Sequence, residues 1–337
     1  MSIKFLATIG PSSFSEKIIR ALAENNVGLF KINLSHTKIS DLEGIISNLQ
    51  EWSSVPVCLD SEGAQVRNQY MVNESVAFNE GDTVKIHPNE IKGDNKNISF
   101  VPTNVFKQLK INDLIYVDFH AVTLKVIERN DKFLLAKAIS TGVVGSNKAV
   151  NINREIDLEP MTKKDFEAFD IGKRMGIKDY ALSFTNSASD VKLVRKIIGE
   201  DANLISKIES IRGVLNLDEI LPLVNNILID RGDLSREIAI EKIPFIQRRI
   251  ISKARSKQVP VYVATNLLES MVKARTPTRA EVNDVASTLL MGADGLVLAA
   301  ETAIGKFPLE AVQMINSLVN QFKRWTPESS IRDIIFD

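Results

Sequence analysis

The feature that most constrains the fold is a series of short apolar runs that alternate with amphipathic stretches. Eight runs of strand length recur, at residues 3–9, 27–34, 55–59, 177–184, 204–208, 226–230, 259–264 and 295–300. Between them lie segments with the apolar spacing of helices, at residues 16–24, 37–51, 163–175, 190–198, 244–257, 279–291 and 308–322. This alternation predicts βαβ units with parallel strands. Eight repeats predict an α/β fold of the closed (β/α)₈ TIM-barrel class.

One interval breaks the alternation. Residues 68–157, after the third run, show no helical period and contain short β segments at residues 83–87, 114–118, 122–126 and 133–138. The dipeptides Gly81-Asp82 and Asn130-Asp131 are turn signals between these segments. We therefore expect a small β domain inserted after the third strand as a lid, with barrel residues 1–67 before it and 158–337 after it. Without the insert, 247 residues remain, close to the roughly 250 typical of such barrels.

The composition excludes several classes of protein. The chain of 337 residues is 44% hydrophobic and 25% charged, and 42 Lys and Arg balance 42 Asp and Glu. Because the net charge is zero, we expect neither nucleic acid nor an anionic membrane as a partner. The single cysteine, Cys58, allows no disulfide within the chain. With no signal-peptide pattern and no run long enough to span a bilayer, we expect a cytoplasmic protein.

Polar side chains gather where the predicted strands end, which is where catalysis occurs in barrels of this kind. Lys207 and Glu209 are two residues apart and leave a strand on the same face, and Asp233 comes just after the next strand. One cation and two carboxylates at neighbouring strand ends can hold a divalent metal and an anionic substrate together. For any single charge, ordinary solvation of a strand end remains the alternative. The other strand ends carry Pro11, Asn33, Ser35, His36, Asp60, Arg67, Ser183, Thr265, Asn266 and Glu301.

The types of these side chains indicate which metal they would hold. Oxygen-bearing groups predominate, and oxygen-rich sites suit hard cations such as Mg²⁺ or Mn²⁺. One cysteine and three histidines in the whole chain argue against zinc. His36, a lone histidine at a polar strand end, can also be structural.

Taken in order, several short motifs resemble the signatures of the pyruvate kinase family. The pair Lys207-Ile-Glu209 and Arg231-Gly-Asp-Leu234 is highly specific, whereas Thr278 and Glu281 also fit a helix capping box. The family has a barrel with a β lid after the third strand, the architecture expected above. The motifs are Thr8-Ile-Gly-Pro11, Asn33-Leu-Ser-His36, Ser206-Lys-Ile-Glu209, Arg231-Gly-Asp-Leu234, Ala264-Thr265 with Leu268-Glu-Ser-Met271, Pro277-Thr-Arg-Ala-Glu281, and Glu301-Thr-Ala303 with Pro308-Leu-Glu-Ala311.

The resemblance implies Mg²⁺- or Mn²⁺-dependent phosphoryl transfer between phosphoenolpyruvate or pyruvate and ADP or ATP. Lys207 would stabilise the charge on the transferred phosphoryl group and on the enolate, and Glu209 and Asp233 would hold the divalent metal. Thr265 would lie near the carbon that is protonated, and Lys31 stands where the family has a catalytic arginine. The implied substrate-binding residues are Gly232, Asp233, Thr265 and Ser183; the monovalent-cation ligands are Asn33, Ser35, Asp60 and Ser61; the nucleotide-binding residues are Pro11, His36, Arg67 and Lys148.

The chain departs from the family pattern mainly on the nucleotide and lid side. Lys31 keeps the charge of the family's arginine but loses its bidentate fork for phosphate. Gln65 replaces a glutamate, which makes K⁺ an optional rather than an expected cofactor. The remaining departures are Glu62 for a lysine, Asp118-Phe119-His120 for Asp-Asp-Gly, Thr185-Asn186 for Ile-Arg, Asp230 for a small apolar residue and Ser235 for a glycine.

Two other functions stay open. The changes at Glu62, Gln65, Phe119 and Asn186 suggest an enzyme that keeps the metal–enolate chemistry on a pyruvyl or 2-oxo-acid substrate but does not use ADP. A non-catalytic relative that serves as a binding module is the third reading. The family's C-terminal α/β domain carries effector binding and part of the subunit contact, and this sequence ends before such a domain could begin. We therefore expect a monomer or homodimer without allosteric control through that domain.

Overall fold

The computed structural model describes residues 3–118, 120–130 and 132–336. Phe119 and Asp131, which the sequence analysis used, lie outside the described residues. The chain forms two compact units. One comprises the residues up to Gly63 and those from Pro160 onward, and the other is Ala64–Glu159.

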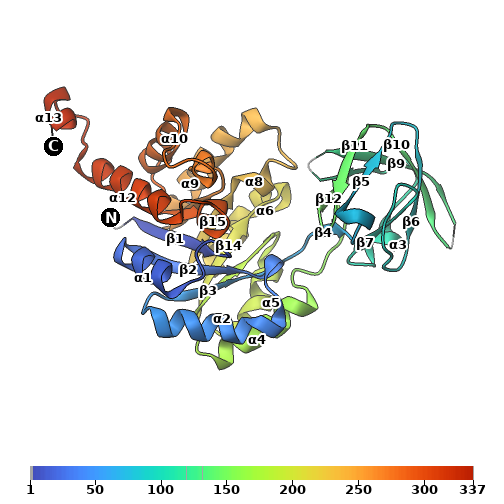
Figure 1. Cartoon of the computed structure of the whole chain (residues 1–337), viewed down its shortest axis with the longest axis horizontal. Helices are drawn as coiled ribbons and strands as arrows, with labels where there is room; N and C mark the ends of the chain where they lie inside the picture. Colours follow the sequence, from blue (N-terminus) through green and yellow to red (C-terminus); the bar gives the residue numbers. More distant parts are fainter. Residues whose placement is uncertain (1–2, 119, 131, 337) are drawn as a thin grey trace. The chain divides into compact units, whose positions relative to one another are not determined.

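The first unit is a closed barrel of eight parallel strands, as predicted (Figure 1). β1 pairs with both β2 and β17, so the first and the last strand close the barrel. All carboxyl ends of the strands therefore lie at one end of the barrel. The strands, in their order around it, are β1 (Lys4–Ile9), β17 (Gly295–Leu298), β16 (Val261–Ala264), β15 (Asn226–Asp230), β14 (Asn203–Ile208), β13 (Asp179–Leu182), β3 (Val57–Asp60) and β2 (Val27–Asn33).

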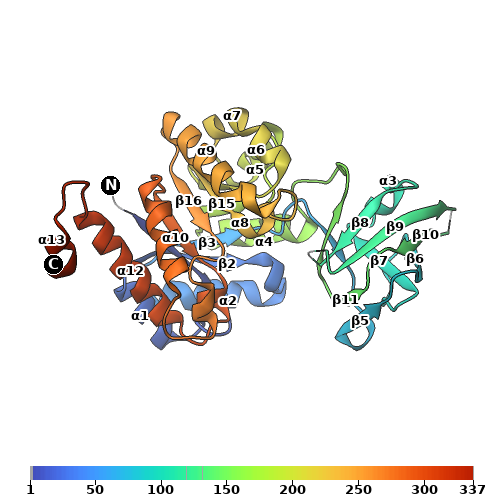
Figure 2. The same ribbon diagram turned by 90° about the horizontal axis from the view of Figure 1, so that it is seen from above.

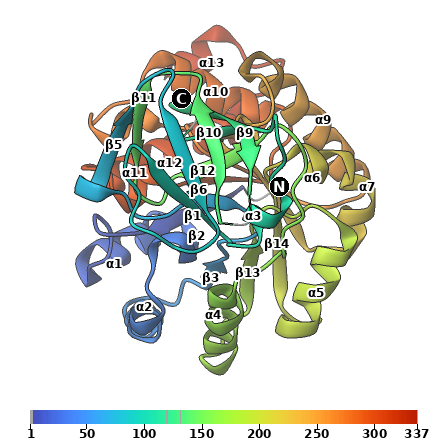
Figure 3. The same cartoon turned by 90° about the vertical axis from the view of Figure 1, so that its right-hand side faces the viewer.

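Helices surround the strands (Figure 3). The longer helices turn an apolar stripe inward, as α2 does with Leu42, Ile46 and Leu49. The connection from β14 to β15, for which the sequence predicted no helix, contains two short ones, α6 (Ile211–Leu215) and α7 (Leu217–Ile220). The other helices of this unit are α1 (Glu16–Glu24), α2 (Ile39–Trp52), α4 (Lys163–Arg174), α5 (Ala188–Ile198), α8 (Arg231–Leu234), α9 (Ile243–Ser256), α10 (Arg279–Leu290), α11 (Ala300–Ala303), α12 (Pro308–Arg324) and α13 (Ile331–Phe336).

Apolar side chains fill the inside of the barrel, so it is a packed core and not a channel. They include Leu6, Cys58, Ile205, Leu228 and Tyr262, each at most 2% exposed. Burial, with a smaller contribution from the negative charge of Asp60, raises the pKa of the Cys58 thiol well above its usual value.

The second unit is a β structure with a hydrophobic core of its own (Figure 2). Its four predicted β segments correspond to β6 (Thr83–His87), β8 (Leu114–Val117), β9 (Val122–Arg129) and β10 (Leu134–Ala138). Together with strands that were not predicted they close a small barrel in the order β10-β6-β7-β4-β12-β8-β9. The additional elements are β4 (Val66–Asn68), β7 (Asn97–Val101), β12 (Ala149–Ile152), the separate pair β5 (Ser75–Phe78) and β11 (Gly142–Gly145), and the short helix α3 (Val105–Gln108). Across the described residues of both units, every helix is too short or too polar to cross a membrane.

Candidate active site

The centre of the candidate site is the ammonium group of Lys207, near the carboxyl end of β14. Its Nζ lies 2.9 Å from Glu209 Oε1, 3.3 Å from Asp60 Oδ1 and 3.0 Å from Ser183 Oγ. Lys207 is only 6% exposed. Burial alone would lower the pKa of Lys207, but the carboxylates of Asp60 and Glu209 outweigh this effect and hold the pKa well above its usual value. Lys207 is therefore a fixed positive charge at the end of the barrel.

A second lysine contacts the same carboxylate. Lys31 on β2 forms an ion pair with Asp60 Oδ2 at the end of β3. Burial would raise the pKa of Asp60, but the ammonium groups of Lys207 and Lys31 bring it below its ordinary value. Asp60 is thus ionised, and each of its two carboxylate oxygens faces a lysine.

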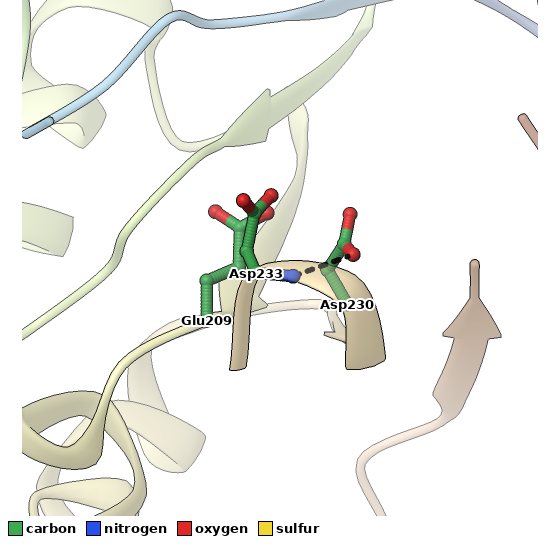
Figure 4. A group of neighbouring side chains, drawn as sticks. All are labelled: Glu209, Asp230 and Asp233. Carbon is green, nitrogen blue, oxygen red and sulfur yellow. Dashed lines mark hydrogen bonds between the residues drawn. The ribbon is translucent and has the colours of Figure 1, made fainter. Parts of the chain in front are cut away.

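Three carboxylates gather close to one another (Figure 4), and their charges act on Lys207. Glu209 follows β14, Asp230 ends β15 and Asp233 lies in α8, and one oxygen of each is within 4.8 Å of the others. Burial and the charges of Asp233 and Asp230 raise the pKa of Glu209 to about 8, against the attraction of Lys207. Burial and the charge of Asp230 likewise raise the pKa of Asp233. A hard divalent cation fits this group, because its donors are all oxygens and its like charges are crowded together.

The chain after β15 folds back on the carboxylate of Asp230. Asp230 is the N-cap of α8, and its Oδ1 accepts hydrogen bonds from the amide groups of Gly232 and Asp233, at 3.2 and 3.4 Å. The hydroxyl of Thr265, which follows β16, donates to the same oxygen at 2.5 Å. Gly232, Asp233 and Thr265, three of the residues expected at the substrate, therefore surround one carboxylate.

Ser183 joins the ends of three strands. Its Oγ donates to the carbonyl oxygen of Ser61 at 2.6 Å, and its amide donates to Ser61 Oγ at 2.9 Å. The next amide, that of Phe184, donates to Glu209 Oε2 at 2.6 Å. A side chain at Gly63 would meet the carbonyl oxygen of Ser183 at 2.5 Å, which explains the glycine there. These contacts hold the buried charges in a fixed arrangement.

The residues expected at a monovalent cation lie at the adjacent ends of β2 and β3. Asn33 pairs with Asp60 in the sheet register, and Ser61 follows directly. Asn33 Oδ1 accepts the amide of Ser35 at 3.0 Å, in the short 3₁₀ turn Leu34–His36. The four residues are thus neighbours, and Asp60 is the one that also contacts both lysines.

Comparison with known proteins identifies the family. The family model described as "Pyruvate kinase, barrel domain" matches residues 1–312. The chain belongs to the pyruvate kinase family. The resemblance drawn from the motifs is thereby confirmed.

Individual members of the pyruvate kinase family agree with this. The pyruvate kinase of Thermotoga maritima is 33% identical over 332 residues, which cover 96% of this chain and 71% of that protein. The pyruvate kinase of Thermococcus litoralis is 33% identical over 321 residues, or 93% and 68% of the two chains. The crystal structure of a pyruvate kinase from Cryptosporidium parvum matches with a TM-score of 0.86 and 30% identity, covering 97% of this chain and 70% of that one. The protein is thus a pyruvate kinase-like enzyme.

The residues expected at the nucleotide are divided between the two units. Pro11 follows β1 and His36 follows β2, so both lie at the carboxyl ends of barrel strands in the first unit. Arg67 and Lys148 belong to the second unit. There Arg67 donates to Gln65 Oε1 at 3.0 Å and to the carbonyl oxygen of Asn147 at 2.8 Å. Lys148 lies 3.7 Å from Asp118 in an ion pair and lines a hollow of that unit.

Two charged residues of the site were missing from the sequence-based set. In the sequence analysis Asp230 is only a departure from the family pattern, although it is the last residue of β15. Arg236, which forms an ion pair with Asp233 at 2.6 Å, is absent from the predicted site residues. The spacing of three residues between Asp233 and Arg236 is one at which side chains meet on a helical turn. That spacing was the available signal.

Proposed function

We propose that the chain transfers a phosphoryl group between phosphoenolpyruvate and ADP, using a divalent cation held by Glu209 and Asp233. The observation that carries the proposal is the buried ammonium group of Lys207, 2.9 Å from Glu209 and beside the carboxylate group that fits a metal. Such a pairing places fixed positive charge where a phosphoryl group and an enolate both need it. Membership of the pyruvate kinase family supports the same reaction.

The protein's own contribution would be mainly electrostatic. Phosphoryl transfer passes through a loose transition state whose charge is spread over several oxygens, so positioning and positive charge lower the barrier. Lys207 would face the transferred group and the enolate oxygen, while Asp60 and Glu209 hold its ammonium in place. Mg²⁺ or Mn²⁺, when bound, would polarise the phosphoryl and enolate oxygens as a Lewis acid.

The other residues would orient the two substrates. On the pyruvyl side Thr265 would lie near the carbon that gains a proton, and Ser183 would hold Lys207 by its hydroxyl. Lys31 would act indirectly: its ion pair with Asp60 would hold that carboxylate in place against Lys207. Substrate contacts would come from Gly232, Asp233, Thr265 and Ser183, nucleotide contacts from Pro11, His36, Arg67 and Lys148, and optional K⁺ contacts from Asn33, Ser35, Asp60 and Ser61.

A coupled assay tests the proposal. Pyruvate formed from phosphoenolpyruvate and ADP is reduced to lactate, and the rate is followed with Mg²⁺ present. Lys207→Met should lower kcat by at least about 100-fold, the order of loss seen when one group that stabilises transition-state charge is removed. Lys253→Met is the matched control, because Lys253 also pairs with a carboxylate, that of Asp218, but both side chains are exposed.

Absence of lactate with the wild-type chain, or equal rates for both variants, would refute the proposal.

The same assay, run once with K⁺ and once with tetramethylammonium in its place, measures whether the reaction requires a monovalent cation. Because Lys31 and Lys207 already neutralise Asp60, we expect less than about a threefold loss of rate, within the range of a minor electrostatic effect.

A second candidate reaction uses a pyruvyl or 2-oxo-acid substrate without ADP. The observation that favours it is Glu62, which stands where the family has a lysine. Its carboxylate forms an ion pair with Lys164 at 2.8 Å, so the positive charge of Lys164 is already neutralised and is less able to bind the phosphates of ADP. An enzyme of this kind would bind Mg²⁺ and oxalate, a mimic of the enolate, but would form no lactate in the coupled assay with any nucleoside diphosphate.

A further inference from the structure

The carboxylate of Asp230 has three hydrogen-bond donors on a single oxygen. Asp230 Oδ1 accepts the amide groups of Gly232 at 3.2 Å and Asp233 at 3.4 Å, and the hydroxyl of Thr265 at 2.5 Å. All three donors come from residues that the proposed function assigns to the pyruvyl substrate. Two amides and a hydroxyl that meet at one point are a donor set for a carboxylate oxygen.

Helix capping explains only part of this arrangement. An aspartate at an N-cap ordinarily accepts the amides two and three residues further on, as Asp230 does. Thr265 belongs to another strand end, and its φ of +76° is a left-handed conformation that a threonine seldom adopts. A side chain at Gly232 would meet Thr265 Cγ2 at 2.7 Å, so the two segments approach closely. The backbone is thus arranged to bring the Thr265 hydroxyl to Asp230.

We propose that Asp230 is a specificity-determining residue: its carboxylate occupies the donors that would otherwise hold the carboxylate of the substrate, and so weakens the binding of carboxylate-bearing ligands. The inference rests on the proposed function, because it concerns the pyruvyl group placed there. Hydrogen-bond donors engaged by the protein must be released before a ligand can use them. A carboxylate-bearing ligand would therefore displace Asp230 or bind with fewer hydrogen bonds.

Charge acts in the same direction as the hydrogen bonds. Asp230 lies with Glu209 and Asp233 in a group whose ligand oxygens are within 4.8 Å of one another. Lys207 and Arg236 are the cations that face this group, and they already pair with Glu209 and Asp233 respectively. Among the described residues, no ion pair of Asp230 with a cation is seen. An incoming carboxylate thus meets a third carboxylate in this group, one without an ion pair of its own there. A neutral residue at position 230 removes this repulsion.

Oxalate binding by calorimetry, at saturating Mn²⁺, tests the inference without requiring turnover. Asp230→Ser keeps an oxygen that can cap α8 but is too short to reach Thr265, and Asp230→Ala removes both interactions. Asp230→Asn keeps the acceptor while removing the charge. Asp218→Ser is the matched control, because the side chain of Asp218 is exposed. Mn²⁺ affinity, measured by electron paramagnetic resonance for each variant, keeps changes in metal binding separate.

We expect Asp230→Ser and Asp230→Ala to bind oxalate at least tenfold more tightly than the wild type. Asp230→Asn should fall between, and Asp218→Ser should match the wild type. Unchanged or weaker oxalate binding by folded Asp230→Ser at saturating Mn²⁺ would overturn the inference. Should Asp230→Ala not fold, the serine variant decides alone. A wild-type chain that makes no lactate would refute the proposed function, whereas the order of oxalate affinities tests Asp230 itself.

Discussion

Glu209 shows how much a single residue of this site depends on its surroundings. It is 1% exposed and lies close to the carboxylates of Asp230 and Asp233. Burial and the two neighbouring negative charges therefore disfavour its ionised form, in spite of the attraction of Lys207. The pKa of Glu209 is raised to about 8 in the folded protein, whereas a glutamate in an unfolded chain titrates near 4.3. Between those two pH values the folded state binds a proton that the unfolded state does not.

This difference predicts a pH dependence of stability. Because the folded state holds the extra proton, the free energy of unfolding of the metal-free protein should fall as pH rises from about 5 to 8. Glu209→Gln is neutral at every pH, so its stability should depend less on pH across that window. Urea unfolding followed by circular dichroism, at half-unit steps of pH in the presence of a chelator, measures both curves. Parallel curves for wild type and variant would contradict the raised pKa.

The contacts of the site could be predicted from the sequence only in part. Lys207, Glu209 and Asp60 were predictable because parallel strands bring their carboxyl ends to one side of a barrel. The hydrogen bond from Thr265 to Asp230 was not, since it depends on a left-handed backbone at a threonine. Left-handed backbone is frequent at glycine and enriched at Asn, Asp and His, so the sequence gives no signal for it at a threonine.

Among the elements, the barrel strands were the most predictable and the strands of the second unit the least. Barrel strands are buried on both faces, so they appear as continuous apolar runs. In the second unit, β7 begins with Asn97 and contains Ser99, and β11 begins and ends with glycine. Such strands are defined by their pairing with β6 and β5, which lie elsewhere in the chain.

The start of α4 is joined to the loop after β3 by one buried carboxylate. Asp165, at 0% exposure, accepts the amide groups of Glu62 at 2.7 Å, Gly63 at 3.1 Å and Thr162 at 2.9 Å. It also completes the capping box of α4 with Thr162. This contact fixes the loop that follows Asp60, and so it supports the site from outside.

Replacing that carboxylate should destabilise the fold measurably. Asp165→Ala leaves three amide groups without their acceptor and should lower the free energy of unfolding by roughly 3 kcal/mol. Thr278→Ala removes the cap of α10, at an exposed helix end, and should cost about 1 kcal/mol. Urea titrations of both variants give the comparison. A loss in Asp165→Ala no larger than that in Thr278→Ala would show that the contact with the β3 loop adds nothing.

At the scale of the whole molecule, the site depends on the closure of the barrel. Lys31, Asp60, Lys207 and Asp233 come from β2, β3, β14 and α8, and the pairing of β1 with β17 completes the ring that holds these strands. The second unit contributes its own core and carries Arg67 and Lys148. The sequence predicted this division because the rhythm of strand and helix stops and later resumes.

The central claim is that Glu209 and Asp233 hold a divalent cation beside Lys207, and the most direct measurement is a Mn²⁺ titration of the full chain followed by electron paramagnetic resonance. The wild type should bind Mn²⁺ at this site, and Glu209→Gln combined with Asp233→Asn should weaken that binding by at least about 100-fold. Removing a residue that only hydrogen-bonds a metal ligand already lowers metal affinity by about 10–100-fold, and here the two ligands themselves are changed. Equal Mn²⁺ affinity of the wild type and the double variant would contradict the account.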